Sequence, residues 1–296
     1  MRGRPAKNEY RFNAHVLILL FEFLFASASI SAQDRPLQTP DAETVASGTV
    51  RTSTGFDFLQ DQKIPFSGLQ GDLTSVGVLD LRVGVGKIVE LQLMGAARNF
   101  LSIKEQGASF TTLNLSSSNS TSDTGDFSLW TKVRIIGEGK RRPAVAFRFG
   151  FEMPNSNQAR GIGTNSTNVF AMVILEKHIG KLKVFGDLGL GILQSPLQLF
   201  SQNDELLYGG AFSYPIFRRV DLVGEVAGRH STRKISSALV GTESRGQARL
   251  GVQILAGGFQ WDVAGIAGIY QNDARTGFTF GVSRDVSLFK IPSDSK

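Results

Sequence analysis

The stretch GRHSTRKISS holds the residues whose types best suit catalysis. His230 and Ser231 adjoin each other as a base and a nucleophile would, and Glu225 lies five residues before the histidine. A nucleophile and its base must meet side by side, but neighbouring residues of a strand point to opposite faces. The spacing therefore disfavours a dyad, although a loop at this position would relax the argument. We predict that the chain has no catalytic residues and is not an enzyme.

Metal and cofactor chemistry finds little support in the residue types. Cysteine is absent, and one of the three histidines, His15, lies near the N-terminus. His178 and His230 alone cannot make a multi-histidine metal site. GIGTNS, 161–166, is only superficially like a phosphate-binding loop, because no basic residue or helix follows it. We expect no metal, no cofactor and no nucleotide.

A larger group of charged residues alternates with apolar residues, which places the two kinds on opposite faces of strands. We predict that these charged residues line or fill an enclosed lumen: Asp80, Arg82, Glu90, Lys132, Arg134, Arg148, Glu152, Lys183, Asp187, Glu225 and Arg249. Two interpretations stay open for them. They can pair into an ion network that packs the interior, or they can set which solute passes, and both can hold together.

The stretch RRPAVAFRFGFEMPN shows the alternation most clearly. Val145, Phe147, Phe149 and Phe151 fall on one face, whereas Arg148 falls on the other. Glu152 shares the face of Arg148, four positions later. An aromatic face of this kind is either the core side of a soluble sheet or a surface in contact with lipid.

Twelve such segments follow one another, and none has a sustained helical period. They span 46–58, 74–86, 87–104, 124–138, 141–154, 168–179, 181–192, 204–216, 218–230, 244–257, 259–271 and 276–289. Tight turns, most of them with glycine, alternate with longer links at 59–73, 105–123, 155–167, 193–203 and 231–243, before a short last one at 272–275.

The order of the links distinguishes the two folds. Greek-key crossings mix loop lengths at both ends of a soluble sandwich, whereas outer-membrane barrels keep short periplasmic turns and long external loops. We predict an all-β fold, an antiparallel up-and-down transmembrane β-barrel of about 12 strands. The aromatic face of 145–151 then faces lipid.

The N-terminus has the pattern of a secretory signal. Basic residues precede an apolar run at 16–25, and small residues follow in ASASISAQ. We predict a signal peptide at 1–32, a flexible periplasmic leader at 33–45, a barrel at 46–290 and a C-terminal tail at 291–296. Without 1–32 the formal net charge falls from +6 to +4, because four basic and two acidic residues leave. That charge favours no nucleic-acid partner.

Two features depart from strict alternation. Residues 169–175 are apolar on both faces, which indicates a plug, a ligand groove or, the interpretation we favour, a packed lumen. Aromatic residues near strand ends are typical of interfacial girdles. They are Phe127, Trp130, Phe212, Tyr214, Trp261, Tyr270 and Phe289.

Several stretches resemble a bacterial family named for the MetA pathway of phenol degradation. They are GTVRTSTGFDF, VLDLRVGVGKIVELQL, TGDFSLWTKVRIIGEGKRRPAVAFRFGFEMPN, GIGTNSTNVFAMVILEK and GDLGLGI. The resemblance covers about residues 48–290, and it departs from the family where Asn155 and Ser156 replace the usual Thr-Gly after Pro154. It implies an outer-membrane barrel that transports solutes, with no catalytic residues.

Together these patterns predict passive uptake or release of small solutes across the bacterial outer membrane, and the resemblance implies that these solutes are hydrophobic or aromatic. The expected partners are membrane lipid and lipopolysaccharide, the outer-membrane assembly machinery and a small-molecule solute. Two alternatives remain: a closed structural or adhesive barrel, and an outer-membrane lipid hydrolase.

Overall fold

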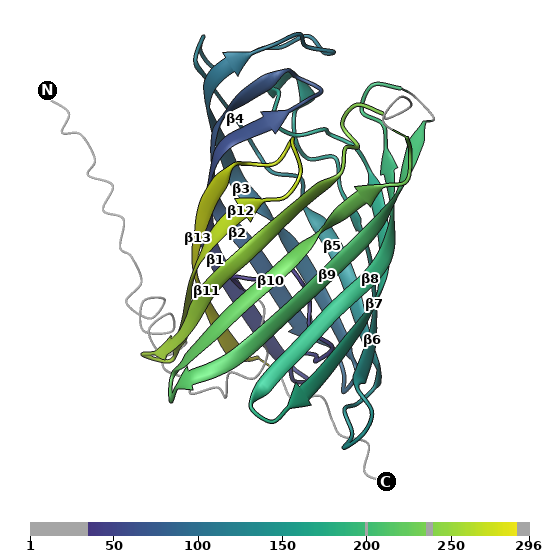
Figure 1. The fold of residues 1–296 in the computed structure, drawn as a ribbon, viewed down its shortest axis with the longest axis vertical. Coiled ribbons are helices and arrows are strands. Elements are labelled where there is room, and N and C mark those ends of the chain that lie inside the picture. The colour runs from purple at the N-terminus through teal and green to yellow at the C-terminus, as the bar shows by residue number, and fades with distance from the viewer. Residues whose placement is uncertain (1–34, 199–200, 235–238, 289–296) are drawn as a thin grey trace, which may run out of the picture.

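The computed structural model describes residues 35–198, 201–234 and 239–288, and they form one closed antiparallel β-barrel (Figure 1). Twelve strands make the wall: β1 (Thr49–Ile64), β2 (Leu69–Gly84), β3 (Val89–Gln106), β5 (Ser128–Ile136), β6 (Ala144–Glu152), β7 (Asn168–Ile179), β8 (Leu182–Gln194), β9 (Gln202–Phe217), β10 (Val220–Ser231), β11 (Arg245–Ala256), β12 (Phe259–Gly268) and β13 (Thr276–Ser287).

Closure comes from the pairing of the first strand with the last. Thr49 of β1 lies opposite Ser287 of β13, and the ladder continues to Gln60 opposite Thr276. A further short strand, β4 (Ser120–Asp123), pairs with the upper part of β3, on the edge that β5 pairs with lower down, and so extends the wall above β5. Because the ring is closed, the wall leaves no unpaired strand edge among these twelve.

The alternation of side chains sorts the two faces as the sequence predicts. In β6, Phe149 and Phe151 are 47% and 43% exposed, whereas Arg148 between neighbouring apolar positions is 5% exposed. Exposed large apolar residues recur on the outer face of the other strands, such as Leu188 and Leu250. The wall is therefore apolar outside and polar inside, the reverse of a soluble barrel.

The two ends of the barrel differ in their connections. Short turns lie at the lower end in Figure 1, and the longer links, with β4, lie at the upper end. The first upper link differs from the prediction of 59–73, since β1 and β2 extend until only residues 65–68 connect them. The extension pairs Lys63 with Gln70 and carries polar residues on both faces, so apolar alternation could not reveal it.

Helix is almost absent from the described residues. One 3₁₀ turn, η1 (Gln158–Arg160), lies in the link between β6 and β7. Among the described residues, no helix has the length and hydropathy needed to cross a membrane.

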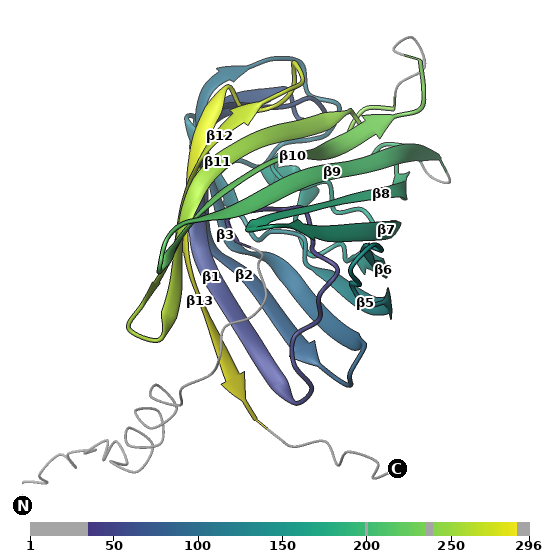
Figure 2. The same ribbon diagram turned by 60° about the horizontal axis from the view of Figure 1, so that its bottom comes forward.

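The N-terminal segment differs from the expectation of a flexible leader. Its described part, residues 35–48, runs inside the barrel at the lower end (Figure 2) and is mostly buried. We call residues 35–48 the plug. The predicted signal peptide, residues 33 and 34, Phe289 and the tail at 291–296 lie outside the described residues.

The outer face should tolerate charge only near its ends. Leu188→Arg, in the middle of β8, is expected to lower the free energy of unfolding by about 2–4 kcal/mol in lipid vesicles. Phe217→Arg, at the lower end of β9, is the matched control and should cost only about 0–1 kcal/mol. Equal costs in denaturant titrations would contradict a lipid-facing surface.

Candidate functional site

Carboxylates of the barrel wall hold the plug by its backbone. Glu225 accepts hydrogen bonds from the N–H groups of Gln38, at 2.8 and 2.9 Å, and of Thr39, at 2.8 Å. Further along, Glu176 accepts from the N–H of Ala42 at 2.9 Å and Glu90 from that of Val45 at 2.6 Å. Enclosed N–H groups must find acceptors, and ionised carboxylates make the strongest hydrogen bonds to them.

One side chain of the plug completes an ion cluster. Asp41 is fully buried and its carboxylate lies 2.8 Å from the Nζ atom of Lys183 and 3.4 Å from that of Lys132. Burial alone would raise the pKa of Asp41, but the two lysines outweigh it and hold this pKa well below its ordinary value. Asp41 therefore contributes stability at neutral pH, and this contribution is lost only when the pH falls through the lowered pKa.

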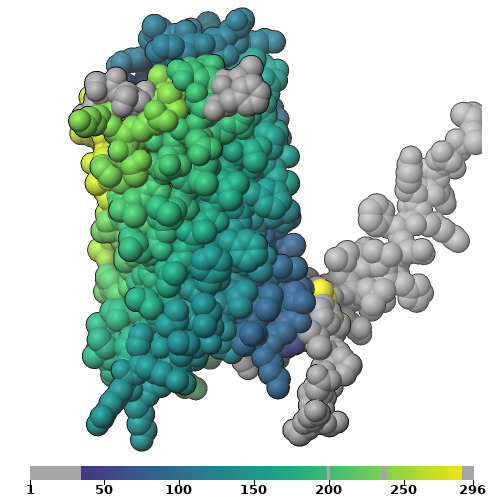
Figure 3. Space-filling model, turned by 90° about the vertical axis from the view of Figure 1, so that its right-hand side faces the viewer, coloured from purple at the N-terminus to yellow at the C-terminus, as the bar shows by residue number. Residues whose placement is uncertain are grey.

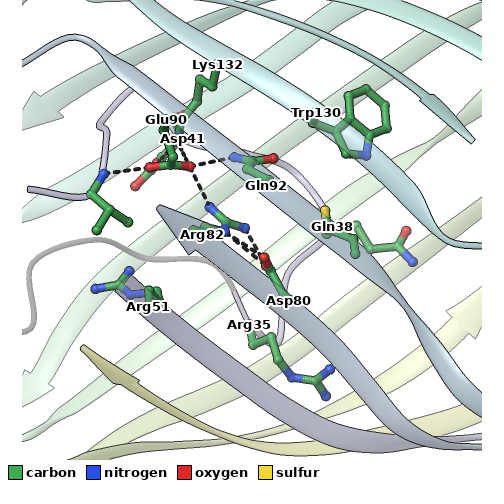
Figure 4. A network of polar contacts seen from close by, with 12 residues as sticks. Arg35, Gln38, Asp41, Arg51, Asp80, Arg82, Glu90, Gln92, Trp130 and Lys132 are labelled. Carbon is green, nitrogen blue, oxygen red and sulfur yellow. Dashed lines mark hydrogen bonds and ion pairs between the residues drawn. The ribbon is translucent and has the colours of Figure 1, made fainter. Parts of the chain in front are cut away.

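The cluster continues along β2 and β3 (Figure 4). Glu90 lies 3.4 Å from Lys132 and accepts a hydrogen bond from Gln92 at 2.6 Å. Arg82 lies between two acids, with 2.6 Å to Asp80 and 3.8 Å to Glu90. Opposite charges thus alternate across the interior, which offsets the cost of burying each one.

The first described residue anchors the other end of the plug. The Arg35 guanidinium donates to the Thr279 hydroxyl at 2.8 Å and lies 3.5 Å from Asp57 and 3.6 Å from Asp262. Gly281 makes room for it, because a Cβ there would clash with the guanidinium. Arg249 also donates to the carbonyl oxygen of Pro36 at 2.7 Å.

Above the plug lies a cavity of about 450 Å³ with one apolar wall. Trp130 stacks on Phe170 with ring centroids 5.2 Å apart, and Met172 and Leu207 extend this wall. The Arg148 guanidinium lies over the indole, 3.9 Å from the ring centroid. Because barrel lumens are usually polar, an aromatic wall at this depth is a specific feature of this chain.

The rest of the cavity is polar and leads upward. Glu152, Arg229, Arg245 and Gln62 line both this cavity and a second one of about 290 Å³ among the upper links. Charges of both signs face the space, and Arg229 lies 3.1 Å from Glu205. The shared lining places the two cavities next to each other, one at the plug and the other among the upper links.

The structure places the predicted lumen residues in three groups. Eight are buried inside the barrel: Asp80, Arg82, Glu90, Lys132, Arg148, Lys183, Glu225 and Arg249. Glu152 and Asp187 line the cavity. Arg134 instead lies at the lower rim, where its guanidinium donates to the carbonyl oxygen of Lys87 at 2.9 Å. Most of the buried group contacts the plug or residues that bind it, so these residues hold the plug as well as lining a lumen.

The sequence pointed to part of the apolar wall, at 169–175, but not to the place of Trp130 in it or to the segment that forms the plug. Trp130, predicted in an interfacial girdle, faces inward because it is two residues from Lys132 and shares its face. Phe170 and Met172 belong to the stretch that is apolar on both faces, and the inner set packs in one cluster with Ala42 of the plug. The parity of Lys132 was the signal that could have placed the tryptophan.

His230 has a different partner from the one the sequence offered. Ser231 accepts a hydrogen bond from Asn203 at 2.8 Å, whereas the Nδ1 atom of His230 lies 3.5 Å from the hydroxyl of Ser244 and 3.2 Å from that of Tyr270. His230 is exposed near the upper rim. His230 and Ser231 therefore do not contact each other through their side chains, as expected for neighbours in a strand. Ser244, in the link between β10 and β11, lies near the histidine instead.

Comparisons with known proteins support the fold alone. No protein-family model and no curated protein matches the sequence, so the resemblance to the phenol-degradation family is not confirmed. Among solved structures, the NanC porin has a TM-score of 0.46 at 9% identity, over 82% of this chain and 100% of that one. The translocator domain of the autotransporter NalP from Neisseria meningitidis has 0.44 at 12% identity, over 80% and 87% of the two chains.

A third similar structure corrects one prediction. LpxR from Salmonella typhimurium has a TM-score of 0.42 at 8% identity, over 80% of this chain and 99% of that one. The prediction that the chain is not an enzyme is wrong as an inference from this architecture, because outer-membrane barrels of similar fold include an enzyme beside the porins. The protein is a β-barrel of the bacterial outer membrane.

The Asp41 cluster should control the order of the plug. Removing one partner of a buried ion pair costs about 3–5 kcal/mol, so Asp41→Asn should speed amide exchange at Gln38, Thr39 and Ala42 about a hundredfold or more. Hydrogen exchange read by mass spectrometry on the folded barrel measures this.

The matched control for that measurement is Asp61→Asn. Asp61 lies 2.8 Å from Lys104 at the upper end, away from the plug. An unchanged exchange rate in Asp41→Asn, or an equal rise in the control, would show that the cluster does not hold the plug.

Proposed function

We propose that the protein is an outer-membrane channel for the passive movement of small, hydrophobic or aromatic solutes. The upper end faces the outside of the cell, because outer-membrane barrels keep their short turns in the periplasm. Solute enters among the upper links, binds in the cavity above the plug and leaves when the plug moves aside. The stretches that resemble the phenol-degradation family point to the same solute class.

The observation that carries the proposal is the aromatic wall of Trp130 and Phe170. These rings pack with Met172, Leu207 and Ala42 of the plug, and the apolar side of the cavity that they form gives an aromatic or hydrophobic solute a surface to pack against. The cavity volume of about 450 Å³ lies within the range of small-molecule sites, about 300–1,000 Å³. Polar groups opposite the wall can orient a hydroxyl or carboxylate substituent.

The plug is the barrier on the periplasmic side. Hydrogen bonds and ion pairs hold the plug in the lumen, so the plug can move aside if water replaces these contacts. Many of its bonds converge on the wall acids Glu225, Glu176 and Glu90. Loosening the segment at Asp41 should therefore open the path without altering the outer wall.

Solute flux in proteoliposomes tests both parts. A hydroxybenzoate anion and a sugar of similar volume are suitable probes, since neither crosses a bare bilayer quickly. Trp130→Ala should slow aromatic flux relative to sugar flux about twofold to tenfold, the range expected for losing one aromatic pair. Asp41→Asn should speed the flux of both probes.

Trp261→Ala is the control, because Trp261 is 39% exposed on the outer face and should leave selectivity unchanged. In the Trp261→Phe background, quenching of Trp130 fluorescence reports binding separately from flux. If the folded protein shows neither conductance nor flux, even with Asp41→Asn, the channel proposal fails and the closed structural barrel is supported.

A lipid hydrolase is the second candidate, and the contact between His230 and Ser244 favours it. A serine within reach of a histidine at the external rim meets the outer leaflet. If this activity exists, His230→Ala and Ser244→Ala should each abolish ester hydrolysis in lipid micelles, whereas Ser231→Ala should retain it. Full activity in His230→Ala would end this candidate.

A further inference from the structure

Exposed cations gather on four of the five short hairpin turns that the structure describes at the lower end of the barrel. Four turns that follow one another around the ring, β2–β3, β5–β6, β7–β8 and β9–β10, carry them, and the turn at Gly257 and Gly258 carries none. We call these residues the cationic arc: Lys87, Lys140, Arg141, Arg142, Lys181, Arg218 and Arg219. Short teal turns of this region project from the lower end of the barrel in Figure 3.

The single acid on these turns is used to hold the longest of them in place. Glu138 accepts hydrogen bonds from Lys177 at 2.7 Å and from the N–H of His178 at 3.0 Å, and its other oxygen lies 2.6 Å from the histidine ring. Lys177 also donates to the carbonyl oxygen of Gly139 at 2.7 Å. The turn at 137–143 is thereby tied to β7, and its three cations stay exposed.

The charge of Glu138 does not change over the physiological pH range, and its carboxylate is bonded to Lys177 and His178 rather than to the cations of the arc. The hydrogen bond from Lys177, with those from the backbone and ring of His178, lowers the pKa of Glu138 to about 2. Its carboxylate is therefore ionised throughout the physiological range and stays bonded to Lys177 and His178. The same contacts explain why Glu138, His178 and the nearby Glu176 need no metal ion to lie together, since protein donors already serve their oxygens.

Large apolar side chains flank the cations on the outer face. Ile88 is 49% exposed beside the first turn, Ile135 61% beside the second, Ile179 63% beside the third and Phe217 72% beside the fourth. A cation adjoins the apolar residue in Lys87-Ile88 and Phe217-Arg218 and lies two residues after Ile179. Apolar residues this close to cations place the charge at headgroup depth while the side-chain stem stays in hydrocarbon.

We propose that the cationic arc binds the phosphate groups of anionic phospholipids in the inner leaflet of the outer membrane. The apolar flank favours a lipid over an acidic protein, because a soluble partner would have no use for isoleucines and a phenylalanine turned toward hydrocarbon. The arc spans the turns from β2 to β10, so the bound lipids gather beside these strands and leave the stretch of wall from β11 to β1 without them.

Lipid selectivity around the folded barrel tests this proposal. The full chain, in nanodiscs that contain spin-labelled phosphatidylglycerol or phosphatidylcholine, should prefer the anionic lipid about threefold to fivefold at low salt, and the preference should fall as salt is added. The combined variant Lys140→Gln, Arg141→Gln and Arg142→Gln should lose about half of the preference or more.

The control neutralises three exposed cations of the external end, Arg98→Gln, Arg233→Gln and Arg275→Gln, and should keep the preference. Heat-modifiable mobility confirms that each variant is folded. Equal association of the two lipids with the wild type, or an equal loss in the control, would overturn the proposal and leave an acidic periplasmic protein as the partner to seek. None of these outcomes depends on solute flux.

Discussion

The interior of this barrel is organised by the need to satisfy a peptide segment enclosed in it. A chain that enters the lumen brings N–H groups that lose water, and each unsatisfied group costs free energy. Three acids of the wall satisfy these groups: the carboxylates of Glu225, Glu176 and Glu90 accept hydrogen bonds from four backbone N–H groups of the plug. Those acids in turn need cations, so the plug and the ion network of the wall depend on each other.

The same logic explains why the charges of the lumen do not repel or unfold the barrel. Lys132 is fully buried, but it lies between Asp41 of the plug and Glu90 of the wall. Burial strengthens attraction and repulsion alike, so only an arrangement with alternating signs is stable. The contacts show the first interpretation of these residues, an ion network that packs the lower lumen, whereas a role in setting which solute passes stays a prediction.

Above the plug the wall changes character, and this change divides the lumen by function. The lower part is closed by ion pairs, whereas the upper part has an aromatic face and open space. Trp130 joins the two, because it stacks on Phe170 and lies under the guanidinium of Arg148. Outside the barrel, the periplasmic rim adds a cationic arc whose neighbours are apolar. One wall thus presents carboxylates and cations to the plug, an aromatic face to the cavity above it and apolar side chains to lipid.

The number of strands, the residues that face the lumen and the membrane location can be predicted from local patterns in the sequence. Alternation has a period of two, and in β6 it separates Phe149 and Phe151 from Arg148 without reference to any other strand. The lengths of the links can also be read from the sequence, and they follow the predicted order except at 65–68, where four residues join β1 and β2. Such patterns depend only on the residues that form each strand, so they predicted twelve strands close to those observed and eight of the buried charged residues, but not Glu176, Glu205 or Asp262.

Tertiary structure alone decided what the interior contains. Residues 35–48 are polar and rich in turn formers, so their own sequence predicts a flexible leader. The acids that hold them lie on strands more than forty residues further along the chain, from Glu90 to Glu225, and nothing in the local sequence indicates these partners. The partner of His230 is likewise set by the link that precedes β11, not by its neighbour in the chain. Where the relevant partner lies across the barrel, no local pattern carries the information, and closure of the ring is what brings the residues together.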